Sequence, residues 1–301
     1  MTKKSVMNIL NLAAPQTWTG SVTPAVLSLA LSWERTHRIE ILPAVCTFIT
    51  VLFMQAAVNA FDDYADFVKG TDTLENSPDA QDAVIVHGMK PKTALAAGIC
   101  FLFAAAVPAV YLVISCGIVP LVIGIIGALV LTFYAFGPFP ICYLPLGELL
   151  CGLVMGGLIP LAGVYAQTKQ LDLFVLVQAI PTIMGMAVNM FSNNGCDIDK
   201  DLPAGRKTLA CLIGQRRTDV LYRVLLILWV ASPVIILSAR LKWISVIVYS
   251  MAALAFLHLV ARQFKRRLGP AERDGVMTGA TTLVSLVGIS YSLAIVTGVI
   301  L

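Results

Sequence analysis

Long apolar segments separated by short polar ones fill this chain from end to end. A helix needs about 20 apolar residues to cross a bilayer, and nine segments reach or approach that length. The chain lacks the short alternating segments typical of a membrane barrel. The sequence therefore predicts an all-α polytopic membrane protein with about nine transmembrane helices. The nine ranges are residues 17–34, 41–62, 94–115, 118–135, 147–168, 172–193, 219–239, 243–261 and 278–300.

Composition supports this class and makes carboxylates near the apolar segments informative. Of the 301 residues, 58% are hydrophobic and 13% are charged, whereas a soluble domain averages roughly 25% charged residues. The seven cysteines are scattered without the paired spacing of a zinc site or a disulfide framework. The three histidines form no cluster. The candidate functional groups are therefore carboxylates and amides.

The distribution of Lys and Arg predicts the orientation in the membrane. With the N-terminus in the cytoplasm, the segments on that side carry 15 of the 21 basic residues and the outer loops carry five. This excess is the positive-inside pattern. The basic run from Arg262 to Arg267 directly follows an apolar segment, which favours a membrane anchor over a nucleic-acid site. We expect an integral membrane protein with a cytoplasmic N-terminus, an outer C-terminus and no nucleic-acid partner.

Four acidic residues crowd at the cytoplasmic end of the second apolar segment: Asp62, Asp63, Asp66 and Asp72. Asn59, Asp63 and Asp66 are four and three residues apart, so their side chains share one helix face. Like charges at this spacing destabilise a helix, and a carboxylate at the bilayer centre costs about 2.5–3.5 kcal/mol. A bound cation would remove both penalties.

A second acidic cluster follows the sixth apolar segment. Asn193 precedes Asp197 by four residues, as Asn59 precedes Asp63, and the two pairs are offset by 134 residues. Asp201 lies one helical turn beyond Asp197. The repeated spacing favours one site made of two halves over two solvated helix ends, which is the alternative for either cluster alone.

The residue types indicate the kind of ligand. Oxygen donors without thiolates or imidazoles suit a hard cation, and Mg²⁺ typically takes one or two carboxylates together with substrate phosphates. Lys69 follows the first cluster, and Arg206 with Lys207 follows the second. These cations suit phosphate oxygens, although the positive-inside bias alone also explains them. The clusters predict two Mg²⁺ ions around one diphosphate, held by Asn59, Asp63, Asp66, Asp197 and Asp201, whereas Asp62, Asp72 and Asp199 receive no role.

The two motifs resemble those of the UbiA superfamily of intramembrane prenyltransferases, which carries N-x-x-x-D-x-x-x-D on its second helix and D-x-x-x-D on its sixth. Asp197 and Asp201 match the second form. The first form is shortened, because Asp66 follows Asp63 by three residues instead of four. That shortened form is similar to the 1,4-dihydroxy-2-naphthoate polyprenyltransferase branch, which makes menaquinone precursors. Residues 134–148 and 193–209 resemble the same branch.

The resemblance implies a fold and a reaction. The fold would be a single transmembrane prenyltransferase domain over residues 1–301, a bundle around a central cavity in a prokaryotic plasma membrane, with the acidic motifs facing the cytoplasm. The reaction would be Mg²⁺-dependent transfer of a polyprenyl group from a polyprenyl diphosphate to an aromatic acceptor, 1,4-dihydroxy-2-naphthoate, with loss of carbon dioxide. Donor, acceptor and lipid bilayer would be its partners. Oligomeric state is left open.

The implied mechanism gives the candidate residues their roles. Asp63, Asp66, Asp197 and Asp201 would be catalytic, because Mg²⁺ bound there neutralises the diphosphate leaving group. The residues that bind substrate charge would be Lys69, Asn193, Arg206 and Lys207.

Three further residues would act on the reacting carbons. Tyr134, as a catalytic residue, or Tyr143 would present an aromatic face to the allylic cation, although both also suit an interfacial aromatic belt. Glu148 would contact the acceptor or remove a proton. Its alternative is a carboxylate favoured by the helix dipole at the start of the fifth span.

The chain departs from the branch at three positions where Arg is usual. Residues 14–18 near the first helix and residues 82–88 after the second contain none, and Cys196 stands directly before Asp197. Asp62 also stands where the branch more often has Asn. These departures keep open a UbiA-type enzyme for another acceptor, namely 4-hydroxybenzoate, another phenolic ring or a lipid glycerol. A cation-coupled transporter is the alternative from another class, and it predicts helix breakers beside the acids.

Overall fold

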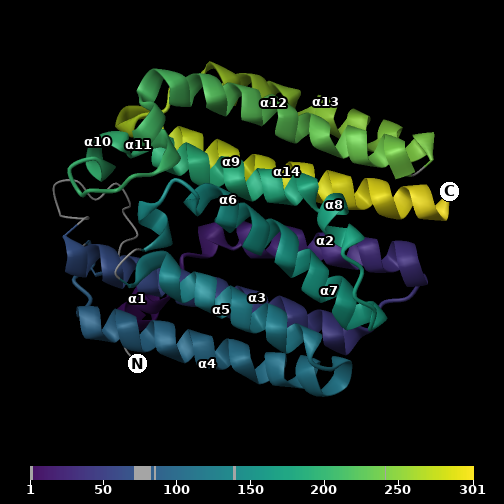
Figure 1. Ribbon diagram of the computed structural model, residues 1–301, viewed down its shortest axis with the longest axis horizontal. Helices are drawn as coiled ribbons and strands as arrows, with labels where there is room; N and C mark the ends of the chain where they lie inside the picture. Colours follow the sequence, from purple (N-terminus) through teal and green to yellow (C-terminus); the bar gives the residue numbers. More distant parts are fainter. Residues whose placement is uncertain (1–2, 71–82, 85, 138–139, 241) are drawn as a thin grey trace.

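The structure is a computed structural model that describes residues 3–70, 83–84, 86–137, 140–240 and 242–301. Every regular element in these ranges is a helix. The long helices lie side by side in one bundle, with α3, α4 and α5 on one side and α12 and α13 on the other (Figure 1). The predicted all-α class is confirmed.

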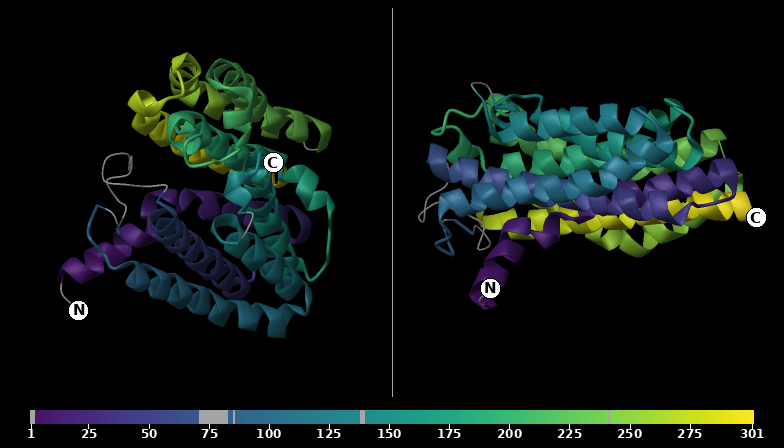
Figure 2. Two further views of the ribbon diagram at one scale, coloured as in Figure 1. Left: turned by 60° about the vertical axis from the view of Figure 1, so that its left-hand side comes forward. Right: turned by 90° about the horizontal axis from the view of Figure 1, so that it is seen from below.

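The chain enters the bundle through α1 (Lys3–Ala13), which lies at a steep angle to the long helices (Figure 2). The N-terminal half continues with α2 (Thr19–Thr36), α3 (Ile41–Lys69), α4 (Pro91–Cys116), α5 (Val119–Ala135), α6 (Gly147–Cys151), a π-helical segment (Gly152–Leu158) and α7 (Ile159–Thr168). The C-terminal half comprises α8 (Phe174–Gln178), α9 (Ile180–Cys196), α10 (Ile198–Asp201), α11 (Leu209–Ile213), α12 (Gln215–Arg240), α13 (Trp243–Lys265) and α14 (Arg273–Ile300).

Each of the nine predicted ranges coincides with a helix or a run of helices. Six helices in the described part of the chain are long and apolar enough to cross a membrane, and Val119–Tyr134 is apolar but shorter. The protein is therefore an integral membrane protein, while the count of nine spans stays a prediction. Two further predicted ranges, 172–193 and 17–34, also fall short of this measure. The helix α9 has only 17 residues, and α2 ends in polar residues from Glu34 to Thr36.

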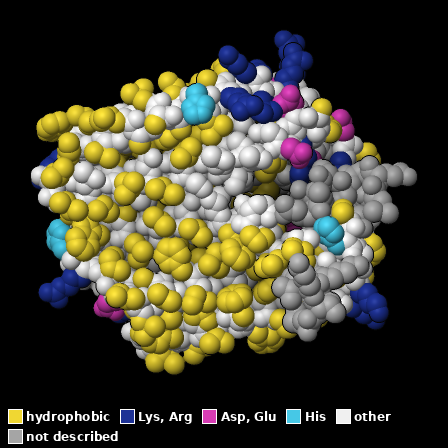
Figure 3. Space-filling view, turned by 180° about the vertical axis from the view of Figure 1, so that it is seen from behind, with side chains coloured by type: hydrophobic (Ala, Val, Ile, Leu, Met, Phe, Trp, Pro, Cys, Tyr) yellow, Lys and Arg dark blue, Asp and Glu magenta, His cyan; other side chains and the backbone are white. Residues whose placement is uncertain are grey.

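The outer surface of the bundle has the character expected of a face in contact with lipid. Large apolar side chains such as Phe103, Val107 and Ile114 are exposed there. Figure 3 shows hydrophobic side chains over the middle of one face, with most Lys and Arg toward the ends. The main core lies instead between α2, α9, α12 and α14, around Trp229 and Tyr291.

Close backbone contact fixes α9 against the π-helical segment. A Cβ at Gly156 would lie 2.5 Å from the backbone of Ile183, and one at Gly152 would lie 2.7 Å from the Ile183 carbonyl oxygen. The Thr182 hydroxyl donates to the Gly156 carbonyl over 2.7 Å, which satisfies an acceptor that the irregular helix exposes. The second acidic cluster, at the end of α9, is thereby held against α6, which carries Glu148.

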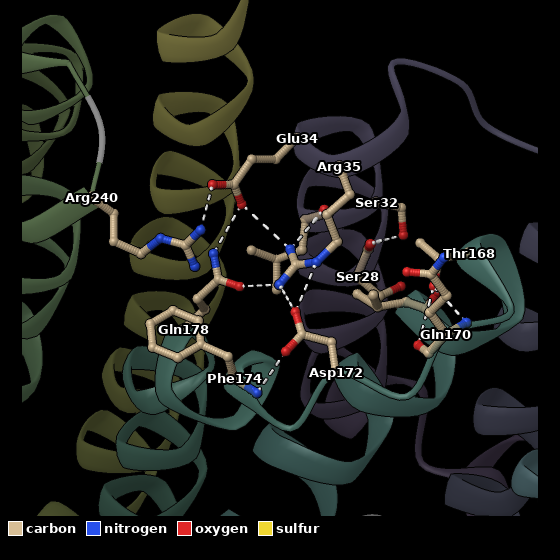
Figure 4. A network of polar contacts seen from close by, with 12 residues as sticks. Ser28, Ser32, Glu34, Arg35, Thr168, Gln170, Asp172, Phe174, Gln178 and Arg240 are labelled. Atoms are coloured by element: carbon tan, nitrogen blue, oxygen red, sulfur yellow. Dashed lines mark hydrogen bonds and ion pairs between the residues drawn. The ribbon is translucent and has the colours of Figure 1, made fainter.

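A polar network closes the end of the bundle that lies away from the acidic clusters (Figure 4). Arg35 Nη2 on α2 donates to Asp172 Oδ2 over 2.7 Å. Glu34 accepts from Gln178 Nε2 over 2.9 Å and lies 3.5 Å from Arg240 Nη2. These contacts tie α2 to α8 and α12, so the two halves of the chain are joined at this end.

Candidate active site

The two acidic clusters meet at one end of the bundle. The C-terminal end of α3, the end of α9 with α10, and the beginning of α14 all lie at this end (Figure 1, left). The predicted pairing of motifs that are far apart in sequence is therefore a feature of the fold.

Arg206 connects the two clusters. Its guanidinium pairs with Asp66 from α3 and lies 3.4 Å from Asp201 Oδ1 (Nη1). The turn after α10 makes this possible, because Gly205 adopts a left-handed conformation (φ 76°) and the Arg206 backbone N–H returns to the Asp201 carbonyl over 3.0 Å. Burial alone lowers the pKa of Arg206, but the negative charges of Asp66 and Asp62 raise it by a larger amount. The net shift of the pKa is upward, so the side chain stays charged.

Asp201 is the most deeply buried carboxylate of the site. It is 0% exposed, and neither carboxylate oxygen has a hydrogen-bond partner among the described residues. Burial raises its pKa to about 6, with Arg206 opposing the rise and Asp197 adding to it. Arg206 is its ion-pair partner at 3.4 Å, but a buried carboxylate without a hydrogen bond still has room for a further ligand, and a cation is the chemical match.

Arg273 is a residue of this site that the sequence patterns did not reveal. From the first position of α14, its Nε donates to Asp197 Oδ1 over 2.9 Å and its Nη2 donates to Asn193 Oδ1 over 2.8 Å. Sequence inspection counts it only among the basic residues of the cytoplasmic side. Cys196, which stands where the resemblance suggests Arg, is buried, and the guanidinium beside Asp197 comes from the last helix instead.

Asn59 and Asp63 are held by two segments outside α3, one before α2 and one after α3. The Asn59 side-chain amide donates to the Ala13 carbonyl over 3.0 Å and to the Thr17 hydroxyl over 2.9 Å. Ala14 between them has a left-handed backbone (φ 44°) that turns α1 into a short 3₁₀ helix at Pro15–Thr17. Asp63 Oδ2 accepts from the Ala83 backbone N–H over 3.0 Å. Both side chains are thus positioned by contacts outside their own helix.

Two cations contact the ring of Tyr143. Lys69 Nζ lies 5.0 Å from the ring centroid, and the Arg206 guanidinium carbon lies 5.3 Å from it. The Lys207 backbone N–H donates to the Tyr143 carbonyl over 3.0 Å, while its side chain is exposed. Tyr143, Lys69 and Arg206 therefore form one group, whereas Lys207 contributes through its backbone.

Tyr134 and Glu148 lie on the helices that face α9. The Tyr134 hydroxyl donates to Met190 Sδ over 3.3 Å. Glu148 is 5% exposed; its Oε1 accepts from Asn194 Nδ2 over 2.9 Å, and its Oε2 has no partner among the described residues. Its helix-dipole interpretation remains open, because Glu148 is in the first turn of α6. A carboxylate that only interacts with the helix dipole would be solvated, whereas Glu148 is buried with one oxygen that makes no hydrogen bond to a described residue.

The acidic residues fit Mg²⁺ by the chemistry of their donors. They offer carboxylate and amide oxygens, and the two buried oxygens of Asp201 make no hydrogen bond within the described residues. In the ranges that the structure describes, no three His, Cys, Asp or Glu side chains are grouped closely enough to hold a metal ion. Arg206 and Arg273 instead contact the carboxylates of Asp66, Asp201 and Asp197.

The three acids without an assigned role differ in position. Asp62 acts electrostatically on Arg206, and Asp199 is exposed. Asp72 lies outside the described residues.

The fold and site define a class: an all-helical membrane bundle that gathers carboxylates and guanidinium groups at one end. The sequence profile of the UbiA prenyltransferase family matches residues 21–294. The chain therefore belongs to the UbiA prenyltransferase family, and the predicted resemblance is confirmed. Family membership makes the protein a prenyltransferase and removes the reason to consider a cation-coupled transporter.

Individual relatives agree with this assignment. The chain is 34% identical over 254 residues to 1,4-dihydroxy-2-naphthoate octaprenyltransferase of Bacillus subtilis (strain 168), which covers 83% of this chain and 80% of that protein. It is 29% identical over 218 residues to UbiA prenyltransferase domain-containing protein 1 of Homo sapiens, covering 71% of this chain and 63% of that protein.

Solved structures show the same fold. A UbiA homolog from Archaeoglobus fulgidus superimposes with a TM-score of 0.66 at 16% identity, covering 96% of this chain and 99% of that chain. The same homolog bound to DMAPP and Mg²⁺ gives a TM-score of 0.66 at 17% identity, with the same coverage. At this identity the likeness concerns the fold.

Proposed function

We propose that this protein transfers a polyprenyl group from a polyprenyl diphosphate to 1,4-dihydroxy-2-naphthoate, with Mg²⁺ and with loss of carbon dioxide, in menaquinone biosynthesis. The observation that carries the proposal is the junction of the two acidic motifs at Arg206, which contacts both Asp66 and Asp201. The identity to the naphthoate octaprenyltransferase, 34% over 83% of the chain, favours this acceptor.

The diphosphate end of the donor would bind among the acidic clusters and their cations. Mg²⁺, when bound, supplies positive charge that stabilises the diphosphate as a leaving group. The residues that would hold it are Asn59, Asp63, Asp66, Asp197 and Asp201. The related structure with DMAPP and Mg²⁺ bound supports this choice of cofactor.

Arg206 and Lys69 would bind the diphosphate oxygens directly. Guanidinium groups form paired hydrogen bonds to phosphate, and an ammonium acts as a point charge. Both groups already surround the Tyr143 ring, so the ring would lie next to the bond that breaks. Lys207 and Asn193 would line the same anionic group, Lys207 from the solvent-exposed side.

The reacting carbons would lie between the diphosphate and the helices of the bundle. Departure of diphosphate leaves an allylic cation, which the faces of Tyr143 and Tyr134 would stabilise. The hydrogen bond from the Tyr134 hydroxyl to Met190 holds the outer end of that ring against α9. The isoprenoid tail is apolar and would extend among the apolar helices or into lipid.

Glu148 would meet the acceptor. Its Oε1 is held by Asn194, and its Oε2 is buried without a partner in the described part of the chain. A buried oxygen of this kind accepts a hydrogen bond from a phenolic hydroxyl, or takes its proton as the ring attacks the allylic carbon. Glu148 therefore has the chemistry to activate a dihydroxylated ring.

A competition assay tests the reaction and the acceptor. Purified protein with Mg²⁺ would receive 1,4-dihydroxy-2-naphthoate and 4-hydroxybenzoate together, with prenyl diphosphates of several lengths, and products would be identified by mass. We expect a prenylated naphthoquinol that has lost carbon dioxide. A product from the benzoate alone would contradict the proposed acceptor while keeping the family reaction.

Two substitutions test the acidic residues in the same assay. We expect Asp63→Ala and Asp197→Ala each to lower kcat by about 100-fold or more, since each removes a group that balances charge in the transition state. Exposed Asp199→Ala, made in the same segment, should retain activity. Full activity of either site variant with added Mg²⁺ would show the two-cluster assignment to be wrong.

A further inference from the structure

The last helix of the bundle begins inside the site rather than beside it. Arg273 is the first residue of α14, and it is 9% exposed. Its helix then runs to Ile300 at the opposite end (Figure 1). A buried arginine at the beginning of a membrane helix requires anionic partners, because an uncompensated buried charge is unfavourable.

Three contacts place the guanidinium across the second acidic cluster. Arg273 Nε donates to Asp197 Oδ1 over 2.9 Å, and Nη2 reaches Asp197 Oδ2 at 3.4 Å. The same Nη2 donates to Asn193 Oδ1 over 2.8 Å. One planar group thus joins two side chains that are one helical turn apart.

The position of these side chains explains what the contact achieves. Asp197 is the C-cap of α9, where the backbone leaves helical geometry (φ −105°, ψ 10°). Backbone hydrogen bonds to Asn193, Asn194 and Asp201 hold the main chain of Asp197, but its carboxylate still has several staggered rotamers. Arg273 fixes one of them, because a side-on pair with a guanidinium defines the plane of the carboxylate.

The first turn of α14 is itself held firmly by α13. Buried Gln263 on α13 donates from Nε2 to the Gly275 carbonyl over 3.0 Å and accepts from the Tyr222 hydroxyl over 3.2 Å. Arg266 forms an ion pair with Glu272, directly before Arg273. The guanidinium is therefore presented from a fixed support and does not depend on the order of α9.

We propose that Arg273 is a positioning residue that holds Asp197 in the geometry in which it binds the divalent cation, with Asn193 fixed beside it. This inference rests on the proposed function. A carboxylate has about four lone-pair positions, so Asp197 can accept from Arg273 and still bind a cation. Outer partners of this kind orient metal ligands in other proteins, and their loss lowers metal affinity by about 10–100-fold.

Electrostatic repulsion between Arg273 and the divalent cation would weaken metal binding. The excess of carboxylates around the site outweighs this repulsion. The six carboxylates of Asp62, Asp63, Asp66, Asp197, Asp199 and Asp201 outnumber the five cations of Lys69, Lys200, Arg206, Lys207 and Arg273. Negative charge is thus in excess even with Arg273 present. What Arg273 adds is a fixed orientation of the Asp197 and Asn193 side chains.

Direct measurement of metal binding tests this role without any substrate. Mn²⁺ takes the same oxygen ligands as Mg²⁺, and its free-ion electron paramagnetic resonance signal falls on binding. We expect Arg273→Gln to weaken Mn²⁺ binding at least tenfold. Arg273→Lys should recover part of the affinity, because one ammonium supplies the charge but does not span both side chains. The matched control is Arg267→Gln, an exposed arginine of the same segment, which should bind as the parent does.

Each other outcome has a defined meaning. Equal Mn²⁺ affinity in the parent and Arg273→Gln would overturn the proposal, and tighter binding would overturn it by showing that Arg273 competes with the cation. If thermal unfolding shows that Arg273→Gln does not fold, Arg273→Lys carries the test, and parental affinity in that variant overturns the proposal. A parent protein that binds no Mn²⁺ would contradict the metal site of the proposed function itself.

Discussion

At the scale of single residues, arginines order the acidic site. Arg206 contacts Asp66 and Asp201, and Arg273 contacts Asp197. Two of these pairs, Arg206–Asp66 and Arg273–Asp197, join segments that are remote in sequence, so each guanidinium fixes a carboxylate relative to another helix. Glu148 differs, since its Oε1 is held by the neutral Asn194. Its buried Oε2 has no hydrogen-bond partner in the described part of the chain, so this oxygen is placed to meet a hydroxyl of the acceptor.

The substitution Glu148→Gln tests whether this carboxylate takes a proton from the acceptor. The amide keeps an oxygen for the hydrogen bond from Asn194 but cannot take a proton, so we expect kcat to fall by about 10²–10⁴-fold. The KM for the prenyl diphosphate and the melting temperature should change little. Steady-state kinetics on the purified variant, with exposed Glu40→Gln as control, measure this effect. Parental kcat in Glu148→Gln would leave the carboxylate with a structural role only.

At the scale of elements, the π-helical segment determines how close α9 approaches. The glycines at 152 and 156 remove the side chains that would separate the two backbones. Irregular helical turns often occur at functional sites, and this one lies between Glu148 on α6 and the rest of the fifth span. The packing of α9 against this segment therefore controls the position of Glu148 relative to the second acidic cluster.

Gly156→Ala should destabilise the protein by about 1–3 kcal/mol or more. The added Cβ would lie 2.5 Å from the backbone of Ile183, and backbone cannot move aside as a side chain does. Gly124→Ala is the matched control, because its Cβ meets nothing within 4 Å and alanine favours a helix by up to about 1 kcal/mol. Thermal unfolding in detergent compares the two. Equal melting temperatures would contradict the close approach of α9.

At the scale of the whole molecule, the bundle has two polar ends with different tasks. One end gathers the acidic clusters, and the other contains the network around Arg35 (Figure 4). That network is a tie between the two halves of the chain. The site and the tie are separated by the length of the bundle, so changes at one end should not alter binding at the other.

Arg35→Gln tests that separation. It removes a charged donor to Asp172 and Gln178, which we expect to cost about 1–3 kcal/mol of stability. Arg38→Gln, an exposed residue in the loop that follows α2, should leave the melting temperature unchanged. Mn²⁺ affinity should equal that of the parent in both variants. A weakened affinity in Arg35→Gln would mean that the two ends are coupled.

The orientation in the membrane is a second prediction at this scale. The bias of Lys and Arg places the acidic clusters in the cytoplasm. In a variant without native cysteines, Arg38→Cys should react with an impermeant maleimide on intact cells, whereas Arg267→Cys should react only after permeabilisation. The reverse pattern would place the site on the outer side.

The sequence by itself determined the class of protein and predicted which segments carry its chemistry. Apolar segments of membrane length predicted the helices, and spacings of three and four residues placed Asn59, Asp63 and Asp66 on one face. Both signals are local, because hydropathy and helical periodicity depend on neighbouring residues alone. The motifs built on these spacings were also enough to indicate the family.

Only the tertiary structure decided which groups meet. Arg273 contacts Asp197 across 76 residues, and Arg206 contacts Asp66 across 140. No periodic pattern marks such pairs, since each depends on how whole helices pack and on single turns such as that at Gly205. The partners of Glu148 and the close approach of α9 at Gly156 were hidden for the same reason: a contact between distant segments is a property of the packed bundle.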